Sequence, residues 1–276
     1  NMEQKKYNDL QVSANREIEN MRMMKNQLAM QHSKERGEIQ NKHNNEIHMF
    51  QKLIANLREY TKNGAEMNTY ETLHYMKRGF IEQGIILDAE IEIMPNVFIK
   101  NNSEINDNRI HHLILCKTGI YLLETKEWEE KLIHGLTKEN AGIYSFMIDE
   151  MGKYQQELEK EETFEYIVGK DSATIQVKNE GNPVYRAKKL SQILYNCLKE
   201  MQANSIKEKV KPVVYFYNEN GKEIIDLSSE ETPRLKDREQ IVTFFRNEIL
   251  AGKIVYTVQE LEQIREMISR MNYIVS

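Results

Sequence analysis

A carboxylate and an ammonium group lie two residues apart near the middle of the chain, as Glu124 and Lys126. They follow an apolar run, Gly119-Ile120-Tyr121-Leu122-Leu123, which is typical of a buried strand. Side chains two residues apart on a strand point to the same face. A carboxylate there can hold Mg²⁺, which activates water and stabilises the charge developing on a phosphate, while a lysine can orient the water. The pair is therefore typical of metal-dependent phosphodiester hydrolysis, although surface ion pairs have the same spacing.

Glu124 and Lys126 need a rigid scaffold, and the surrounding sequence predicts one. A strand over 109–116, a turn at Thr118-Gly119 and a second strand over 119–126 form a hairpin. Apolar periodicity and turn residues predict the other elements. Before the hairpin they predict a helix from Gly64, a strand over 85–93 ended by Pro95, and a loop over 101–108. After the hairpin they predict short strands around Trp128, Ile133 and 143–148, a charged insertion over 151–162, a helix from Asn182-Pro183, a strand over 213–216, a helix over 241–250, a strand over 254–256, and a last helix opened by a capping box at Thr257 and Glu260. Their order predicts an α/β layer fold.

Residues 1–62 have a different texture and predict a long helix. They hold no proline and one glycine, Gly37, and they are dense in Glu, Lys, Gln, Asn and Met. Because a lone helix cannot bury an apolar stripe, we interpret these residues as a coiled-coil-like oligomerisation or docking arm, and residues 63–276 as the second domain. The alternative is a solvated, partly frayed helix. Apolar residues recur at helical spacing, with an irregular step near His43, at Ile18, Met21, Leu28, Ile39, Ile47, Phe50, Ile54 and Leu57.

Composition limits the classes of function. The chain has 276 residues and a net charge of −5, so nucleic acid would have to bind a local basic patch. Cys116 and Cys197 lack metal-binding spacing and are expected to be buried thiols in a reducing compartment, the cytoplasm. Neither a membrane span nor a signal peptide is expected. The sequence has no Walker-type or G-x-S-x-G motif, which disfavours ATPase and serine hydrolase chemistry.

Four blocks of the sequence together resemble the nuclease-related domain (NERD) family, a branch of the PD-(D/E)xK nuclease superfamily. The most specific is Gly119–Lys126 with Trp128, which resembles the family's Gly-Ile-x-x-x-Glu-x-Lys-x-Trp strand. The other blocks are supportive: Gly64-Ala65-Glu66 resembles the opening Gly-x-Glu helix, Ile110-His111-His112 an Ile-Asp-His strand, and Asn182-Pro183 with Arg186 an Asn-Pro-x-x-Gln helix start. The resemblance covers roughly residues 64–260.

This resemblance implies a restriction-endonuclease-like fold, with a central mixed sheet flanked by helices, and it implies roles for single residues. Glu66 would be the helix carboxylate near the metal, Glu124 a metal ligand and Lys126 the catalytic lysine, with Mg²⁺ or Mn²⁺ as the cofactor. Two positions depart from the family pattern: His111 stands where the metal-binding aspartate is usual, and Arg186 where glutamine is usual.

The histidine leaves three interpretations open, because imidazole is neutral and prefers softer metals than Mg²⁺. The protein can be an active nuclease that uses His111 with Glu66 and Glu124 as a Mn²⁺ ligand or general base, or that recruits Glu104 or Asp107. It can be a degenerate nuclease-fold module that binds DNA or a partner protein. In the third interpretation the resemblance misleads, and His111 is a hydrogen-bonded core histidine.

DNA is the expected partner. Arg186, Lys188 and Lys189 lie near a helix start and can contact phosphates, although a solvated face is the bland alternative; Lys207, Lys209 and Lys211 have the same ambiguity. We therefore expect a metal-dependent DNA endonuclease-like protein acting in bacterial DNA processing or anti-phage defence. It would assemble as a homo-oligomer through its helical arm, and a protein partner is a further option.

Overall fold

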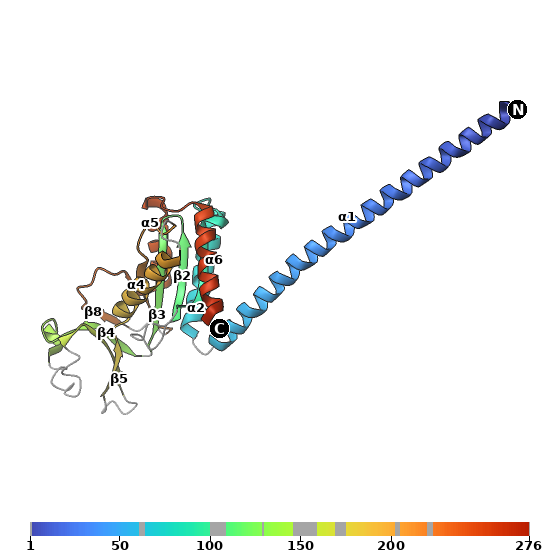
Figure 1. The fold of residues 1–276 in the computed structure, drawn as a ribbon. Helices are drawn as coiled ribbons and strands as arrows, with labels where there is room; N and C mark the ends of the chain where they lie inside the picture. Colours follow the sequence, from blue (N-terminus) through green and yellow to red (C-terminus); the bar gives the residue numbers. More distant parts are fainter. Residues whose placement is uncertain are drawn as a thin grey trace. The chain divides into compact units, whose positions relative to one another are not determined.

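The computed structural model describes residues 2–60, 64–99, 109–128, 130–145, 159–168, 175–201, 205–219 and 223–275 (Figure 1). The chain divides into two compact units, Asn1–Lys62 and Asn63–Ser276. The first unit is one long helix, α1 (Met2–Tyr60). The seam residues predicted at Phe50, Ile54 and Leu57 have side chains outside the described residues. Apolar side chains that are described in α1 are solvent-exposed, among them Ile18, Met21, Leu28, Ile39 and Ile47.

A five-stranded sheet forms the centre of the second unit. Its order is β1-β2-β3-β7-β9, with β1 (Ile91–Phe98), β2 (Arg109–Cys116), β3 (Gly119–Glu127), β7 (Lys211–Tyr217) and β9 (Arg234–Leu235). The first three strands are antiparallel, whereas β7 runs parallel to both β3 and β9, so the sheet is mixed. The predicted hairpin is confirmed, since β2 and β3 pair from Cys116↔Gly119 to His112↔Leu123.

Helices cover both faces of this sheet. On one face, α2 (Gly64–Glu82) and α5 (Arg238–Ala251) share a core with Tyr121 and Leu123 of β3. On the other face, α4 (Pro183–Met201) and α6 (Val258–Val275) share a core with Ile120 and Leu122. Burial on both faces explains why β3 reads as a continuous apolar run. The predicted α/β architecture, a central mixed sheet flanked by helices, is confirmed.

A second sheet was not predicted. Its order is β6-β5-β4-β8, with β4 (Lys131–Leu136), β5 (Glu162–Val168), β6 (Ile175–Gly181) and β8 (Ile224–Asp226). It has a small core of its own around Leu136 and Phe164. The strands β5 and β6 carry too many polar residues to read as buried strands. The bulk of the predicted insertion (151–158), and the predicted loop with Glu104 and Asp107, lie outside the described residues.

One predicted strand is wrong, a second is wrong over the residues that the structure describes, and a third has wrong bounds. Residues 254–256 form no strand; instead, the N–H groups of Val255 and Tyr256 both donate to the Lys117 carbonyl, at 2.8 and 3.0 Å. Gly142–Tyr144 forms the short 3₁₀ helix η2, and residues 146–148 are not described. The strand predicted over 85–93 begins only at Ile91, after the 3₁₀ helix η1 (Asp88–Glu90), and continues through Pro95. Proline is tolerated there because β1 is an edge strand.

Two helix starts are confirmed. The Asn182 side chain caps α4 by accepting from the Tyr185 N–H at 2.9 Å. At the start of α6, the Thr257 N–H donates to the Glu260 carboxylate at 2.9 Å and the Glu260 N–H donates to the Thr257 hydroxyl at 3.3 Å, which is a capping box. Within the described part of the chain, none of the helices combines the length and hydropathy that a bilayer span requires.

Candidate functional site

Three of the predicted site residues meet where the β2–β3 hairpin approaches the start of α2. Continuing the pairing His112↔Leu123 by one residue sets His111 opposite Glu124, so both side chains leave the sheet on one face. Glu66 reaches them from the first turn of α2. The His111 Nε2 lies 3.6 Å from Glu66 Oε1, and its Nδ1 lies 3.6 Å from Glu124 Oε2. All three residues are buried, with 5 to 8% of their surface exposed.

His111 is held as a neutral acceptor. The backbone N–H of Thr125 donates to its Nδ1 at 3.1 Å, so that nitrogen carries no proton. Burial lowers the pKa of His111 well below its usual value, and the charges of Arg109 and Arg186 lower it further. The imidazole therefore adds no charge to the site, and its Nδ1 has no proton to donate to Glu124.

Each carboxylate is paired with an arginine. Arg109, on β2, forms a two-pronged ion pair with Glu66, with Nη2 donating to Oε1 at 2.9 Å, and its Nη1 also donates to Asn96 Oδ1 at 3.0 Å. Arg186, in the first turn of α4, pairs with Glu124. It also donates through Nη2 to the main-chain carbonyl of Arg109 at 2.9 Å. The structure thus turns Arg186, predicted as a DNA contact, inward.

Sequence reasoning missed Arg109. The signal that could have found it is its spacing, because residues two apart on a strand share a face and Arg109 stands two before His111. Its partner Glu66 is 43 positions away along the chain. No local pattern could have predicted that pairing.

Lys126 pairs with a residue of the second sheet. Its Nζ donates to Glu180 of β6, which also accepts from Lys178. Burial alone would raise the pKa of Glu180, but these two ammonium groups hold it below its usual range. Glu180 is therefore a charged anchor for Lys126. It was not predicted, because β6 was not recognised as a strand.

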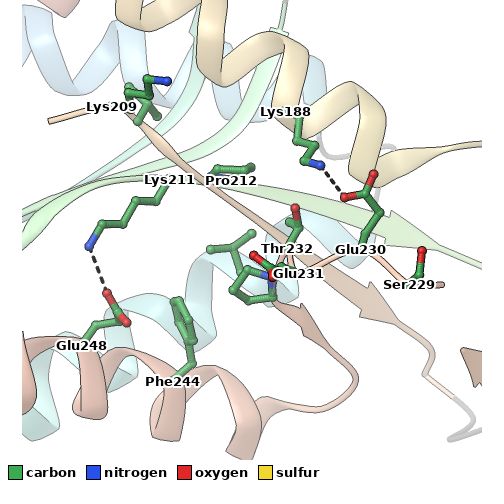
Figure 2. Close-up of a pocket in the computed structure, with 13 residues that line it drawn as sticks. Lys188, Lys209, Lys211, Pro212, Ser229, Glu230, Glu231, Thr232, Phe244 and Glu248 are labelled. Atoms are coloured by element: carbon green, nitrogen blue, oxygen red, sulfur yellow. Dashed lines mark hydrogen bonds and ion pairs between the residues drawn. The ribbon is translucent and has the colours of Figure 1, made fainter.

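The other predicted basic residues are not gathered into one patch. Lys189 lies over the ring of Tyr185, with Nζ 5.9 Å from its centroid. Lys207 pairs with Glu260 at 2.7 Å. Lys188, Lys209 and Lys211 line a groove of about 850 Å³ between α4, α5 and the start of β7 (Figure 2). Glu230, Glu231 and Glu248 line the same groove, where Lys188 pairs with Glu230 and Lys211 with Glu248. The groove carries balanced charge and does not include Glu124 or His111.

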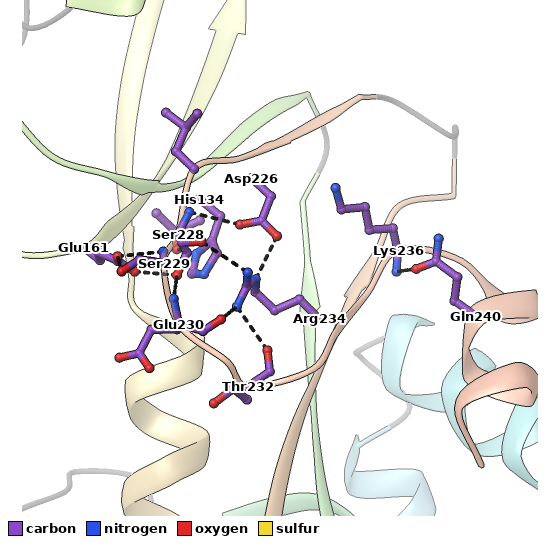
Figure 3. A network of polar contacts seen from close by, with 12 residues as sticks. His134, Glu161, Asp226, Ser228, Ser229, Glu230, Thr232, Arg234, Lys236 and Gln240 are labelled. Carbon is purple, nitrogen blue, oxygen red and sulfur yellow. Dashed lines mark hydrogen bonds and ion pairs between the residues drawn. The ribbon is translucent and has the colours of Figure 1, made fainter. Parts of the chain in front are cut away.

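A second polar cluster braces the connection from β8 to β9 (Figure 3). Arg234 donates from Nε to Asp226 Oδ2 at 2.7 Å and from Nη1 to the Thr232 carbonyl at 3.0 Å. Glu161 accepts from the Ser229 N–H at 3.0 Å and from its hydroxyl at 2.8 Å. The cluster fixes this connection over β4 and contains none of the predicted site residues, so we assign it a structural role.

The described residues do not fit a divalent cation as they are arranged. Glu66 and Glu124 each hold a guanidinium, and His111 is neutral, so their formal charges cancel. Within the described ranges, no three His, Cys, Asp or Glu side chains are placed to share a metal ion. Mg²⁺ and Mn²⁺ need anionic oxygens that are free to face them, and here both carboxylates face arginines. The predicted metal ligands Glu66, His111 and Glu124 therefore lie together, but both carboxylates are paired with arginines.

A protein-family model described as "Nuclease-related domain" matches residues 72–217, more than half of the chain. The match includes His111, Glu124, Lys126 and Arg186 and begins after Glu66. Neither a curated protein nor a solved structure matches.

Proposed function

The chain belongs to the nuclease-related domain family, and from this premise we propose that it binds DNA at the end of β3 without cutting it. In this proposal the domain is a catalytically degenerate nuclease fold, in which Arg109 and Arg186 form ion pairs with the carboxylates of Glu66 and Glu124. Its partner is the phosphate backbone of DNA. A nuclease-related function is what the family membership supports; the loss of cutting is our proposal.

The charge at the site carries this proposal. Four cationic side chains lie there against three carboxylates, which leaves one positive charge in a protein whose net charge is −5. Two of these cations reach solvent and are not turned inward as Arg186 is: the side chain of Lys178 is 64% exposed and that of Lys126 24%. Lysine and arginine at such a rim contact phosphates without reading base sequence.

DNA binding can be tested with a fluorescein-labelled duplex by fluorescence anisotropy. We expect the affinity to fall steeply with salt, and Lys178→Gln to lower the slope of log affinity against log salt by about one phosphate contact. Lys207→Gln is the matched control, because Lys207 is also a partly exposed lysine paired with a glutamate, but its partner Glu260 is at the start of α6 and not at the site. Absence of binding, or equal effects of the two variants, would overturn the proposal.

Metal-dependent DNA cleavage is the second candidate function. It is favoured by the convergence of Glu66, His111 and Glu124 within 3.6 Å, next to Lys126 on the same strand face. These residues would hold Mg²⁺ or Mn²⁺ only after both arginines left the carboxylates. Plasmid incubation with each metal decides between the candidates: nicking that is lost in Glu124→Ala and in Lys126→Ala supports the nuclease, whereas intact plasmid supports the binding module.

The biological setting that we propose follows from the family and from α1. A DNA-binding nuclease fold suits DNA processing or anti-phage defence in the cytoplasm of a bacterial cell. The exposed apolar residues of α1 are suited to pairing with another helix, from a second copy of the chain or from a protein partner.

A further inference from the structure

We propose that Arg109 and Arg186 take the place of a divalent cation at this site, and that substituting His111 and Arg186 would reopen it to Mn²⁺. The inference deepens the proposed function, on which it rests for the site's location, by naming what neutralises the carboxylates. A divalent cation between Glu66 and Glu124 would supply two positive charges. The two guanidinium groups supply the same charge from the protein itself.

Burial is the reason that this charge is needed. The side chains of Glu66 and Glu124, on either side of His111, are only 7% and 6% exposed, so water cannot solvate the two carboxylates. A buried charge is tolerated when it is paired and hydrogen-bonded. Because His111 Nδ1 accepts the Thr125 N–H at 3.1 Å and so carries no proton, the arginines are the cations seen beside both carboxylates in the described structure.

The arginines are fixed as a connected pair, which a surface ion pair is not. Arg109 holds Glu66 with two nitrogens and Asn96 with one. Arg186 joins Glu124 to the main chain of Arg109 through the 2.9 Å bond from its Nη2. A planar guanidinium makes such parallel contacts where an ammonium would make one. Each arginine therefore positions a carboxylate that would otherwise repel its neighbour.

Two substitutions give the neutral site a net negative charge. His111 contacts both carboxylates, so an aspartate there would add a third anion among them. Arg186→Gln removes one guanidinium from Glu124 and keeps an amide. The formal charge of Glu66, Glu124, Arg109, Arg186 and residue 111 is then zero in the native chain, −1 in each single variant and −2 in the double variant. A charge of −2 balances one divalent cation.

Mn²⁺ binding to the full chain, measured by the loss of the free Mn²⁺ signal in electron paramagnetic resonance, tests the inference. We expect the native chain to show no saturable site, and His111→Asp/Arg186→Gln to bind Mn²⁺ at least about 10- to 100-fold more tightly than the upper limit set by the native chain, the range by which changes around a metal alter its affinity. The matched control is His111→Asn/Arg186→Gln, which has the same shape as the double variant but a charge of only −1, and should stay close to the native chain.

Thermal unfolding of each variant, with Mn²⁺ and with EDTA, shows whether the double variant folds and whether Mn²⁺ stabilises it. Stoichiometric Mn²⁺ binding by the native chain that Glu124→Gln abolishes would overturn the inference, as would a folded double variant that binds no better than its control. If the double variant does not fold, the native chain and Glu124→Gln decide alone. DNA binding is measured separately, so a chain that binds neither DNA nor Mn²⁺ refutes the proposed function and leaves this inference standing.

Discussion

Arg186 pairs with Glu124, the carboxylate that was expected to bind a metal ion. The Glu124 side chain is 6% exposed and is paired with the Arg186 guanidinium from α4. Removing one partner of such a pair leaves a buried charge, whereas removing both leaves two neutral amides. The contribution of the ion pair to the free energy of unfolding is therefore a coupling between Glu124 and Arg186. It can be measured only by changing the two residues singly and together.

We expect Glu124→Gln to lower the free energy of unfolding by about 2 to 3 kcal/mol, because Arg186 then lacks its carboxylate. Glu124→Gln with Arg186→Gln should cost less than the sum of the single changes, by about 1 to 3 kcal/mol. Urea unfolding of the four proteins measures this coupling. Lys188 and Glu230 provide the control cycle: they are 45% and 38% exposed, and their coupling should stay within about 1 kcal/mol. Equal couplings in both cycles would contradict the expectation.

His134 on β4 predicts a pH dependence. Burial lowers its pKa to about 4, against the opposing pull of Asp226, Glu161 and Glu230 and with help from Arg234. In the unfolded chain this histidine has a pKa near 6.5, so between about pH 6.5 and pH 4 it is protonated in the unfolded state but not in the folded state. The free energy of unfolding therefore decreases as the pH falls through this range. The loss between pH 7 and pH 5 should be about 2 kcal/mol for this residue.

The measurement is the difference in pH dependence between the native chain and His134→Gln, both unfolded in urea at pH 7 and at pH 5. Glutamine keeps a polar group for the Thr163 hydroxyl, which lies 2.8 Å from His134 Nδ1. The variant should lose less stability on acidification. Parallel pH profiles would show that His134 titrates normally in the folded protein.

Among the elements, the connection between β8 and β9 depends on one glycine of β4. Gly135 has a φ of +74°, and a side chain there would place its Cβ 2.5 Å from the backbone of Ser228. The connection cannot move away easily, because Glu161 and Arg234 hold it on both sides. Its close approach to β4 is therefore a requirement of the second sheet.

Gly135→Ala should lower the free energy of unfolding by about 2 to 4 kcal/mol, since it combines backbone strain with overlap. Gly79→Ala in α2 is the control: the nearest atom to its Cβ is a flexible side-chain atom of Gln83 at 4.0 Å, and alanine favours helix by up to about 1 kcal/mol. A harmless Gly135→Ala, by the same urea unfolding assay, would mean that the connection shifts freely.

At the scale of the whole molecule, the two compact units have different sources of stability. The unit over 63–276 has its own layered cores. The described side chains of α1 leave their apolar residues in solvent, although a helix of 59 residues, about 90 Å long, gains most of its stability from packing. We therefore expect α1 to pair with another helix.

Deleting residues 1–62 should change the assembly and spare the domain. Light scattering should report a dimer or larger assembly for the full chain and a monomer for residues 63–276. The urea midpoint of the domain should stay close to that of the full chain, while the helical circular dichroism signal falls by the contribution of α1. A monomeric full chain would argue against assembly through the arm, and a partner protein would then be the remaining occupant to test.

The sequence predicted those parts of the fold that short local patterns specify, such as apolar runs and capping residues. The apolar run from Ile120 to Leu123 gave its strand because it is buried on both faces, and the Thr257–Glu260 capping box gave the start of α6. The second sheet escaped prediction because β5 and β6 are half-polar strands in a charged region. Residues 254–256 mimic a strand, but their N–H groups bond to the single carbonyl of Lys117 rather than to a neighbouring strand.

The sequence by itself determined the α/β layers, the β2–β3 hairpin and the presence of Glu124 and Lys126 two residues apart on one strand face. Only the tertiary structure decided which charges meet. Glu66 faces Arg109, Glu124 faces Arg186, and Lys126 faces Glu180, across separations of 43 to 62 residues. Periodicity and capping act over a few residues, whereas an ion pair depends on the distance between folded elements. A sequence motif can therefore identify the residues of a site, but it does not show whether a metal ion or an arginine neutralises their carboxylates.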